Sequence, residues 1–276
     1  MEISASTVKA FRDKTGLPMM DCKRALQEAN GNEELAVELL RKAGMKTMAG
    51  RTDRETEAGR IAVFTDPATN VTAMVELLCE SAPVANTEEF ITLIGGLAEQ
   101  LAKGPGAKTA EELLAQPFPG KPGVTLQGFY DDLVNKIREV FRLTRLVRID
   151  GPCGAYVHHN AAVGVLLPIN GDNTDLARDV CMHVASMKPQ ALKKDELDPA
   201  VVEKERKMIV EQVREQNAGK PENIVQKIVD GKMKAFLAEC CLFDQPFVKD
   251  SAKTVAQVCS EGKIEIVQMI HWVLGR

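Results

Sequence analysis

The chain has 276 residues, which is long enough for a hydrophobic core and for more than one domain. Its formal net charge of −4 and its charged fraction of 27% disfavour direct binding of nucleic acid, which requires a basic surface. Seven cysteines without a regular spacing indicate reduced thiols. No apolar run approaches the length of a membrane helix, and the start M-E-I-S-A-S lacks the basic and apolar regions of a signal peptide. The sequence therefore predicts a cytoplasmic protein with no membrane contact.

Residues 1–45 predict a three-helix module. The first helix should end at Gly16, because glycine accepts the positive φ of a helix C-terminus. Asp21 is placed to cap the second helix, and Asn32 to cap the third, which should stop at Gly44. Such a module is too small to enclose a pocket, so binding is its expected use.

Two adjacent methionines, Met19 and Met20, lie between the first two predicted helices. One interpretation is that they pack back onto the small core, as apolar residues usually do. The other is that they are exposed and offer an adaptable thioether surface to a partner protein. The pattern of residues alone favours neither interpretation.

The rest of the chain predicts an α+β fold in which a hairpin followed by a helix occurs twice. This order suggests two related antiparallel-sheet-plus-helix core subdomains, over residues 60–150 and 151–276. Two helices with narrow apolar seams should form an antiparallel coiled-coil hairpin within the second. The expected elements are a linker over 46–59, strands 60–64 and 71–79, helices 90–101, 109–114 and 126–141, strands 143–149, 155–159 and 163–169, a helix over 176–187, the helical hairpin at about 198–240, and a closing strand over 264–273.

Few residues point to covalent chemistry. Cys181 and His183 lie two positions apart on a predicted helix, so they face different directions, and a packed or hydrogen-bonded histidine is favoured over a catalytic one. His158 and His159 alternate across a predicted strand, which disfavours a shared metal. No phosphate-binding glycine motif or esterase motif occurs. We expect no catalytic residue, metal or cofactor.

The stretch R-D-K-T-G-L-P-M-M-D-C-K-R-A-L, which starts at Arg12, resembles the N-terminal module of the bacterial elongation factor Ts family, which is similar to ubiquitin-associated domains. The resemblance continues over nearly the whole chain, with Y-V-H-H-N at 156–160, M-H and K-P at 182–189, G-K-P at 219–221 and Q-P-F-V at 245–248. It implies that Arg12, Met19 and Met20 contact the nucleotide-binding domain of elongation factor Tu. It therefore favours the exposed interpretation of the methionines.

One departure from the family concerns its wedge, C-x-T-D-F-V-A, whose Asp and Phe press into elongation factor Tu near the magnesium site. Here the sequence from Cys79 is C-E-S-A-P-V-A, so the carboxylate and the ring are both absent. The resemblance still makes this stretch and one histidine the expected partner-binding residues: Glu80, Ser81, Ala82, Pro83, Val84, Ala85 and His158. A second departure is Ala161-Ala162, where family members commonly carry Gly-Arg.

The resemblance implies a guanine-nucleotide exchange factor that binds elongation factor Tu in its GDP-bound and nucleotide-free forms and disturbs its magnesium and phosphate contacts. Such a protein performs no covalent catalysis. Three alternatives remain open from the sequence. They are a diverged paralogue that binds elongation factor Tu without exchange, an adaptor that binds ubiquitin-like proteins, and a thiol- or histidine-dependent enzyme.

Overall fold

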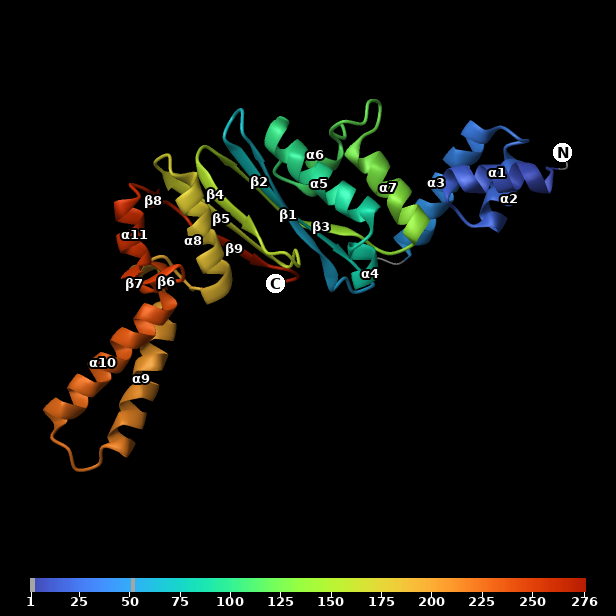
Figure 1. Ribbon diagram of the computed structural model, residues 1–276. Helices are drawn as coiled ribbons and strands as arrows, with labels where there is room; N and C mark the ends of the chain where they lie inside the picture. Colours follow the sequence, from blue (N-terminus) through green and yellow to red (C-terminus); the bar gives the residue numbers. More distant parts are fainter. Residues whose placement is uncertain (1–2, 51–52) are drawn as a thin grey trace. The chain divides into compact units, whose positions relative to one another are not determined.

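A computed structural model describes residues 3–50 and 53–276, apart from the side chains of residues 45–49. The described chain is α+β, with helices and antiparallel sheets, as the sequence predicts (Figure 1). It divides into two compact units, one formed by residues 1–148 with 273–276 and the other by residues 149–272. None of the helices in these described ranges combines the length and apolar character that a membrane span requires.

Three helices form the N-terminal module: α1 (Ala5–Thr15), α2 (Met19–Glu28) and α3 (Glu33–Ala49). Gly16 ends α1 with φ of 68°, and Asn32 accepts a hydrogen bond from the Leu35 N–H at 3.0 Å, as expected of a helix cap. The module has a small core of its own, made of Val8, Phe11, Cys22, Ala25, Leu26, Ala29, Ala36 and Leu40.

The prediction that Asp21 caps α2 is wrong. The helix begins at Met19 after Pro18, which makes no side-chain cap, and Asp21 lies inside the first turn. Its carboxylate instead accepts hydrogen bonds from the side chains of Arg24 and Arg138. Asp21 therefore joins α2 to another element rather than closing the end of its own helix.

The prediction that α3 stops at Gly44 is also wrong, because the helix continues to Ala49, into the segment expected as a linker. Gly44 has a packing role instead. A Cβ atom at this position would lie 1.7 Å from Oδ1 of Asn135 on α7 (Leu126–Ile137). The absence of a side chain thus allows α3 to approach α7 closely.

A three-stranded sheet forms the centre of the first unit, in the order β1 (Ala58–Asp66), β2 (Val71–Cys79) and β3 (Arg142–Asp150). β1 and β2 are the expected antiparallel hairpin, with Ala58 opposite Cys79. Helix α5 (Glu88–Lys103) packs on both strands and on α7 (Figure 1). Short helices α4 (Ala82–Ala85) and α6 (Ala110–Leu114) complete the unit.

Helix α7 ends at Ile137, before the expected end at residue 141. Arg138 adopts a left-handed conformation with φ of 66°, and its N–H closes the helix by donating to the Val134 carbonyl at 2.7 Å. A non-glycine residue in this conformation is uncommon and is held there by its surroundings. Residues 138–141 therefore form a distinct connection between α7 and β3.

In the second unit, β5 (Val163–Asn170) pairs antiparallel with β4 (Cys153–Val157) and β8 (Glu265–Ile266), and also pairs with β9 (Ile270–Val273). The expected closing strand is thus broken into two short strands. Helix α8 (Thr174–Met187) packs on β4 and β5. The smaller elements are η1 (Lys194–Glu196), η2 (Leu242–Asp244), β6 (Pro246–Phe247), β7 (Asp250–Thr254) and α11 (Val255–Glu261).

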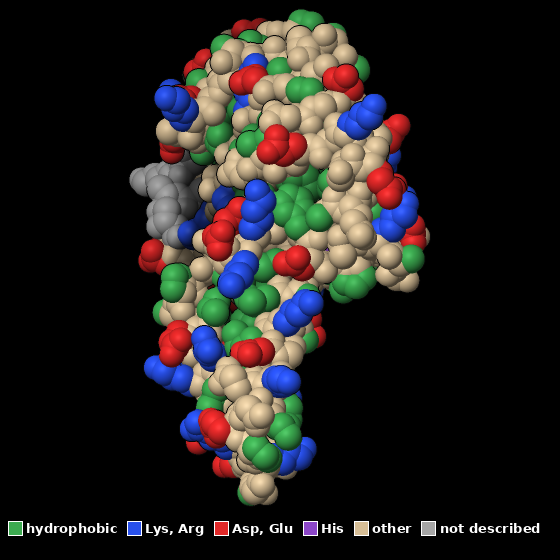
Figure 2. Space-filling model, turned by 90° about the vertical axis from the view of Figure 1, so that its left-hand side faces the viewer, with side chains coloured by type: hydrophobic (Ala, Val, Ile, Leu, Met, Phe, Trp, Pro, Cys, Tyr) green, Lys and Arg blue, Asp and Glu red, His purple; other side chains and the backbone are tan. Residues whose placement is uncertain are grey.

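Helices α9 (Pro199–Gln216) and α10 (Glu222–Cys240) pack on each other as a helical hairpin (Figure 1). Their shared apolar seam is narrow and consists of Ile209, Val213, Val225 and Val229. Figure 2 shows basic and acidic side chains interspersed on the visible face of this hairpin. This face therefore offers both signs of charge to a partner, rather than a single basic or acidic stripe.

Candidate partner-binding site

The N-terminal module exposes an apolar pair at the beginning of α2. Met19 and Met20 are the first residues of the helix, and their exposed fractions are 43% and 69%. Neither belongs to the core of the module, so the interpretation that they are packed inside is not what the structure shows. Arg12 on α1 is also exposed and pairs only loosely with its neighbour Asp13, at 3.3 Å. These side chains are available to a partner.

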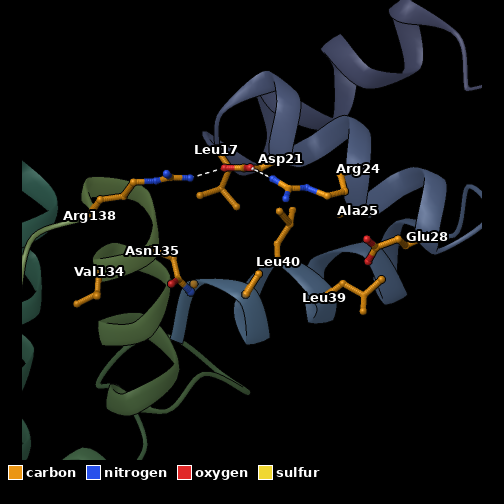
Figure 3. Close-up of a pocket in the computed structure, with 12 residues that line it drawn as sticks. Leu17, Asp21, Arg24, Ala25, Glu28, Leu39, Leu40, Val134, Asn135 and Arg138 are labelled. Carbon is orange, nitrogen blue, oxygen red and sulfur yellow. Dashed lines mark hydrogen bonds and ion pairs between the residues drawn. The ribbon is translucent and has the colours of Figure 1, made fainter. Parts of the chain in front are cut away.

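Ion pairs connect the module to α7 and its C-terminal end. The Asp21 carboxylate accepts from Arg24 on its own helix at 2.5 Å and from Arg138 (Figure 3). Arg41 of α3 binds Asp132 of α7 through two hydrogen bonds of 2.7 Å, which is the bidentate geometry of a strong arginine–carboxylate pair. The polar contacts thus hold two of the module's helices against α7.

A cleft of about 370 Å³ lies between these helices, and the two arginines on Asp21 line it together with apolar residues of α3 (Figure 3). Its walls come from the module and from α7, where Val134 and Asn135 contribute. The ion pairs of Asp21 with Arg138 and of Arg41 with Asp132 span this junction. We therefore assign it to the docking of the module and not to a ligand.

In the stretch that differs from the family's wedge, Ala82–Ala85 form the short helix α4. Hydrogen bonds to the two residues before it, Glu80 and Ser81, hold the helix in place. Ser81 donates to the Glu139 carboxylate through its N–H at 3.1 Å and its hydroxyl at 2.6 Å. Glu80 pairs with Arg54 at 2.9 Å and accepts from the Val140 N–H at 2.8 Å. The carboxylate of Glu80 is thus bound within the first unit, to Arg54 and to the Val140 N–H.

Only part of the predicted stretch faces outward. Ala82 and Pro83 are exposed, Val84 is half-buried, and Ala85 is buried. The Asn86 side chain donates to the Ala82 carbonyl at 2.8 Å, and the Thr87 hydroxyl donates to the Val84 carbonyl at 2.9 Å. The surface on offer is therefore a small apolar tip, Ala82 with Pro83, on a well-bonded turn.

The remaining predicted site residue, His158, lies in the second unit at the turn between β4 and β5. Its Nδ1 is 3.0 Å from the Tyr156 hydroxyl, and its ring packs against that of His159 with centroids 4.2 Å apart. The turn is closed by a 2.7 Å hydrogen bond from the Ala161 N–H to the His158 carbonyl. His158 belongs to the second unit, whereas α4 and the module belong to the first.

Ala161 adopts φ of 55°, a conformation that favours the glycine of the family pattern over the alanine of this chain. We expect Ala161→Gly to raise the free energy of unfolding by about 0.5–1 kcal/mol. Relief of the left-handed strain, about 1–2 kcal/mol, should exceed the entropy gained by the unfolded chain, about 0.4–1 kcal/mol. Urea unfolding would measure this, with Ala162→Gly as the neighbouring control. A loss of stability in the first variant would contradict it.

His183 has a structural role, as the sequence favoured. The ring is fully buried, and its Nδ1 accepts from the Val248 N–H at 3.2 Å, so its Nε2 carries the proton and donates to Gln245 Oε1 at 2.8 Å. Burial lowers the pKa of His183, while the bond to Gln245 opposes that change. Cys181 is also buried, and desolvation raises the pKa of its thiol well above the usual value. This pair has neither the geometry nor the acidity of a catalytic couple.

The buried His183 predicts a pH dependence of stability. Its folded pKa lies below the unfolded value of about 6.5, so its contribution is complete above that pH and is lost as the pH falls. His183→Gln should be less stable at pH 7.5 but should lose less on acidification, by up to about 1.4 kcal/mol per pH unit. Urea unfolding at pH 7.5 and 5.5 tests this, with the exposed His159→Gln as the control. An unchanged slope in the His183 variant would contradict it.

Among the described residues, no group of three or more His, Cys, Asp or Glu side chains could hold a metal ion. Burial also raises the pKa of the Cys79 thiol to about 11, with a smaller contribution from Glu139. Arg138 and Glu139, which hold the module and the α4 tip, were not predicted from the sequence. Neither has a sequence signal, because their partners lie 117 and 58 positions away.

Comparison with known proteins agrees with the resemblance found in the sequence. A family described as Elongation factor TS matches residues 83–276. The elongation factor Ts of a Hydrogenobaculum species is 34% identical, with all of both chains covered. That of an Azoarcus species is 38% identical over 99% of this chain and 91% of its own, and that of Aquifex aeolicus is 36% identical over 100% and 99%. The chain therefore belongs to the elongation factor Ts family.

Proposed function

We propose that the chain is a guanine-nucleotide exchange factor for elongation factor Tu in translation elongation. The observation that carries this proposal is the match to elongation factor Ts proteins, which spans the entire chain. In this role it binds the GDP-bound GTPase, promotes release of GDP and holds the nucleotide-free form until GTP enters. It performs no covalent chemistry, needs no cofactor and acts in the cytoplasm.

Faster release of GDP follows from the thermodynamic coupling between binding of the chain and binding of GDP to the same GTPase. A partner that binds the empty GTPase more tightly than the GDP-bound form must weaken GDP binding by the same free energy. We assign one contact to Met19 and Met20, with Arg12, because both methionines are exposed and thioethers adapt to a partner surface. We assign a second contact to the tip formed by Ala82 and Pro83. His158 provides a third contact from the second unit.

The altered tip bears on the strength of exchange. Pro83 is rigid and apolar, and bonds around Ser81 hold its base in place, so it can still press into a partner. It lacks the carboxylate and ring of the family's wedge, and a stacked ring contributes about 1 kcal/mol beyond its area. We therefore infer either weaker exchange than the family norm or a GTPase whose pocket matches a smaller tip.

The finer architecture is proposed on the same basis. We assign residues 1–45 to a ubiquitin-associated-like module, 46–59 to a connection whose first part is helical, and 60–150 and 151–276 to two related core subdomains. The seam between α9 and α10 supports a short coiled coil. The interspersed charges on this hairpin suit a protein partner rather than nucleic acid.

The test is release of a fluorescent GDP analogue from elongation factor Tu of the same organism, followed by stopped flow with and without the chain. We expect release to accelerate by orders of magnitude and to saturate with the concentration of the chain. Complex formation without acceleration would contradict the exchange function and indicate a binding paralogue. If neither binding nor acceleration occurs, elongation factor Tu is not the partner.

A further inference from the structure

Two of the proposed contact surfaces in the first unit are tied to consecutive residues of one short connection, residues 138–141 between α7 and β3. Arg138 binds Asp21, which lies one residue after Met20 on α2 (Figure 3). Glu139, the next residue, binds Ser81, which immediately precedes Ala82 and Pro83. The connection therefore contacts the base of each surface and forms part of neither.

The connection itself is firmly held. Phe141 is 4% exposed, and its ring lies edge-on to that of Phe90 with centroids 5.1 Å apart. Its carbonyl accepts a 2.5 Å hydrogen bond from the Tyr130 hydroxyl. Arg138 keeps a left-handed backbone conformation that an arginine adopts only when its surroundings require it. These contacts anchor the connection at Arg138 and at Phe141.

The contacts on the side of α4 are numerous and involve charges. The Glu139 carboxylate accepts two hydrogen bonds from Ser81, and the Val140 N–H donates to Glu80 at 2.8 Å. Glu80 in turn binds Arg54, whose carbonyl accepts from Arg142 at 2.9 Å. Hydrogen bonds to charged groups are about twice as strong as neutral ones. The base of the tip thus has little freedom to move relative to the connection.

We propose that residues 138–141 are a positioning element that fixes the methionine surface and the α4 tip relative to each other. The proposal rests on the exchange function proposed above. Arg138 sets the position of the module, which determines how readily the second contact forms once the first is made. Glu139 sets the position of the tip, which determines how far it reaches into the nucleotide site of the partner. Both are positioning residues and neither touches the nucleotide.

The two roles should separate in the kinetics of GDP release. Glu139→Ala frees Ser81, and we expect the maximal release rate to fall about tenfold while the half-saturating concentration changes less than twofold. Glu139→Gln can still accept one hydrogen bond and should recover most of the rate. Arg138→Asn keeps a residue that tolerates the left-handed backbone but removes the ion pair. It should raise the half-saturating concentration about threefold to fivefold and leave the maximal rate unchanged.

The matched control is Arg24→Asn. Arg24 also binds Asp21, but both residues lie on α2, so this variant removes an ion pair without loosening the connection. It should leave both kinetic parameters unchanged.

A further expectation distinguishes positioning from general stability. In a background that carries both Met19→Ser and Met20→Ser, Arg138→Asn should add no further change, because the module then contributes little to binding. Full additivity of the two substitutions would overturn the role of Arg138.

Amide hydrogen exchange provides a readout that does not depend on the GTPase. In Glu139→Ala, the amides of Ser81 and Ala85 should exchange about tenfold faster, because the Ser81 N–H loses its acceptor and the Ala85 N–H donates to the Ser81 carbonyl. The same amides should be unaffected in Arg138→Asn. Unchanged exchange in the Glu139 variant would overturn the positioning role whether or not the chain is active. Failure of the unaltered chain to accelerate GDP release would instead overturn the proposed function.

Discussion

Replacing Arg145 by leucine should lower the free energy of unfolding by about 3–5 kcal/mol, because it leaves a buried carboxylate without its partner. Glu76 on β2 is only 2% exposed, and the Arg145 guanidinium binds both of its oxygens, with the Nε contact at 2.8 Å. Thr144 and the Gly275 N–H donate to the same carboxylate. Urea unfolding followed by circular dichroism would measure the loss.

The loss of unfolding free energy in Arg145→Leu should become smaller as the pH falls. Burial alone would raise the pKa of Glu76, but the hydrogen bonds from Arg145, Thr144 and Gly275 outweigh it, and the pKa is lowered. The unaltered chain therefore has this stabilisation above the unfolded pKa of about 4.3 and loses it as the pH falls. In Arg145→Leu, burial acts with less opposition and raises the pKa, so the variant should regain stability on acidification. The difference between the two chains should shrink from pH 7 to pH 4.

A double variant provides the control. Glu76→Leu combined with Arg145→Leu removes both charges, and such replacements of buried ion pairs are often neutral or stabilising. Most of the stability lost in the single variant should therefore return. Arg145 also donates to the carbonyls of Val273 and Arg276, at 2.8 and 2.6 Å, and those bonds stay broken in the double variant. A double variant as unstable as Arg145→Leu would show that these contacts, and not the buried charge, dominate.

The sequence predicted the elements whose signals are local. The β1–β2 hairpin, helix α5 and the Asn32 cap each depend on residues close together in the chain, and each was found. The resemblance to the family was also found from short motifs, and the comparisons confirm it. Local patterns were therefore sufficient for the fold class and for the family.

The errors occur where a residue serves a distant partner. Gly44 looked like a helix stop, but it provides room for Asn135 on α7. Asp21 looked like a cap, but its carboxylate binds Arg138. Glu139 carried no signal because Ser81 lies 58 positions earlier. For Gly44 and Asp21, packing or pairing across the fold outweighed a local preference that stabilises by about 1 kcal/mol.

The methionine pair should carry much of the affinity for elongation factor Tu. Substituting both Met19 and Met20 by serine should raise the half-saturating concentration for GDP release by about tenfold to a few hundredfold. Burying one fully exposed methionine contributes about 1.5–3 kcal/mol, and each 1.4 kcal/mol corresponds to a tenfold change. The two side chains are 43% and 69% exposed, so together they bury about as much surface as one fully exposed methionine. Because both side chains are exposed in the free chain, the variant should fold with nearly unchanged stability.

The matched control for this substitution is Met187→Ser on α8. Met187 is 49% exposed, between the values for Met19 and Met20, so this variant removes the same kind of apolar surface from a different element. It should leave the half-saturating concentration within about threefold of the unaltered chain, since no contact is assigned to it. An equal loss in both variants would mean that exposed methionines matter only for folding or solubility. Full activity of the Met19 and Met20 double variant would show that the module binds through another face.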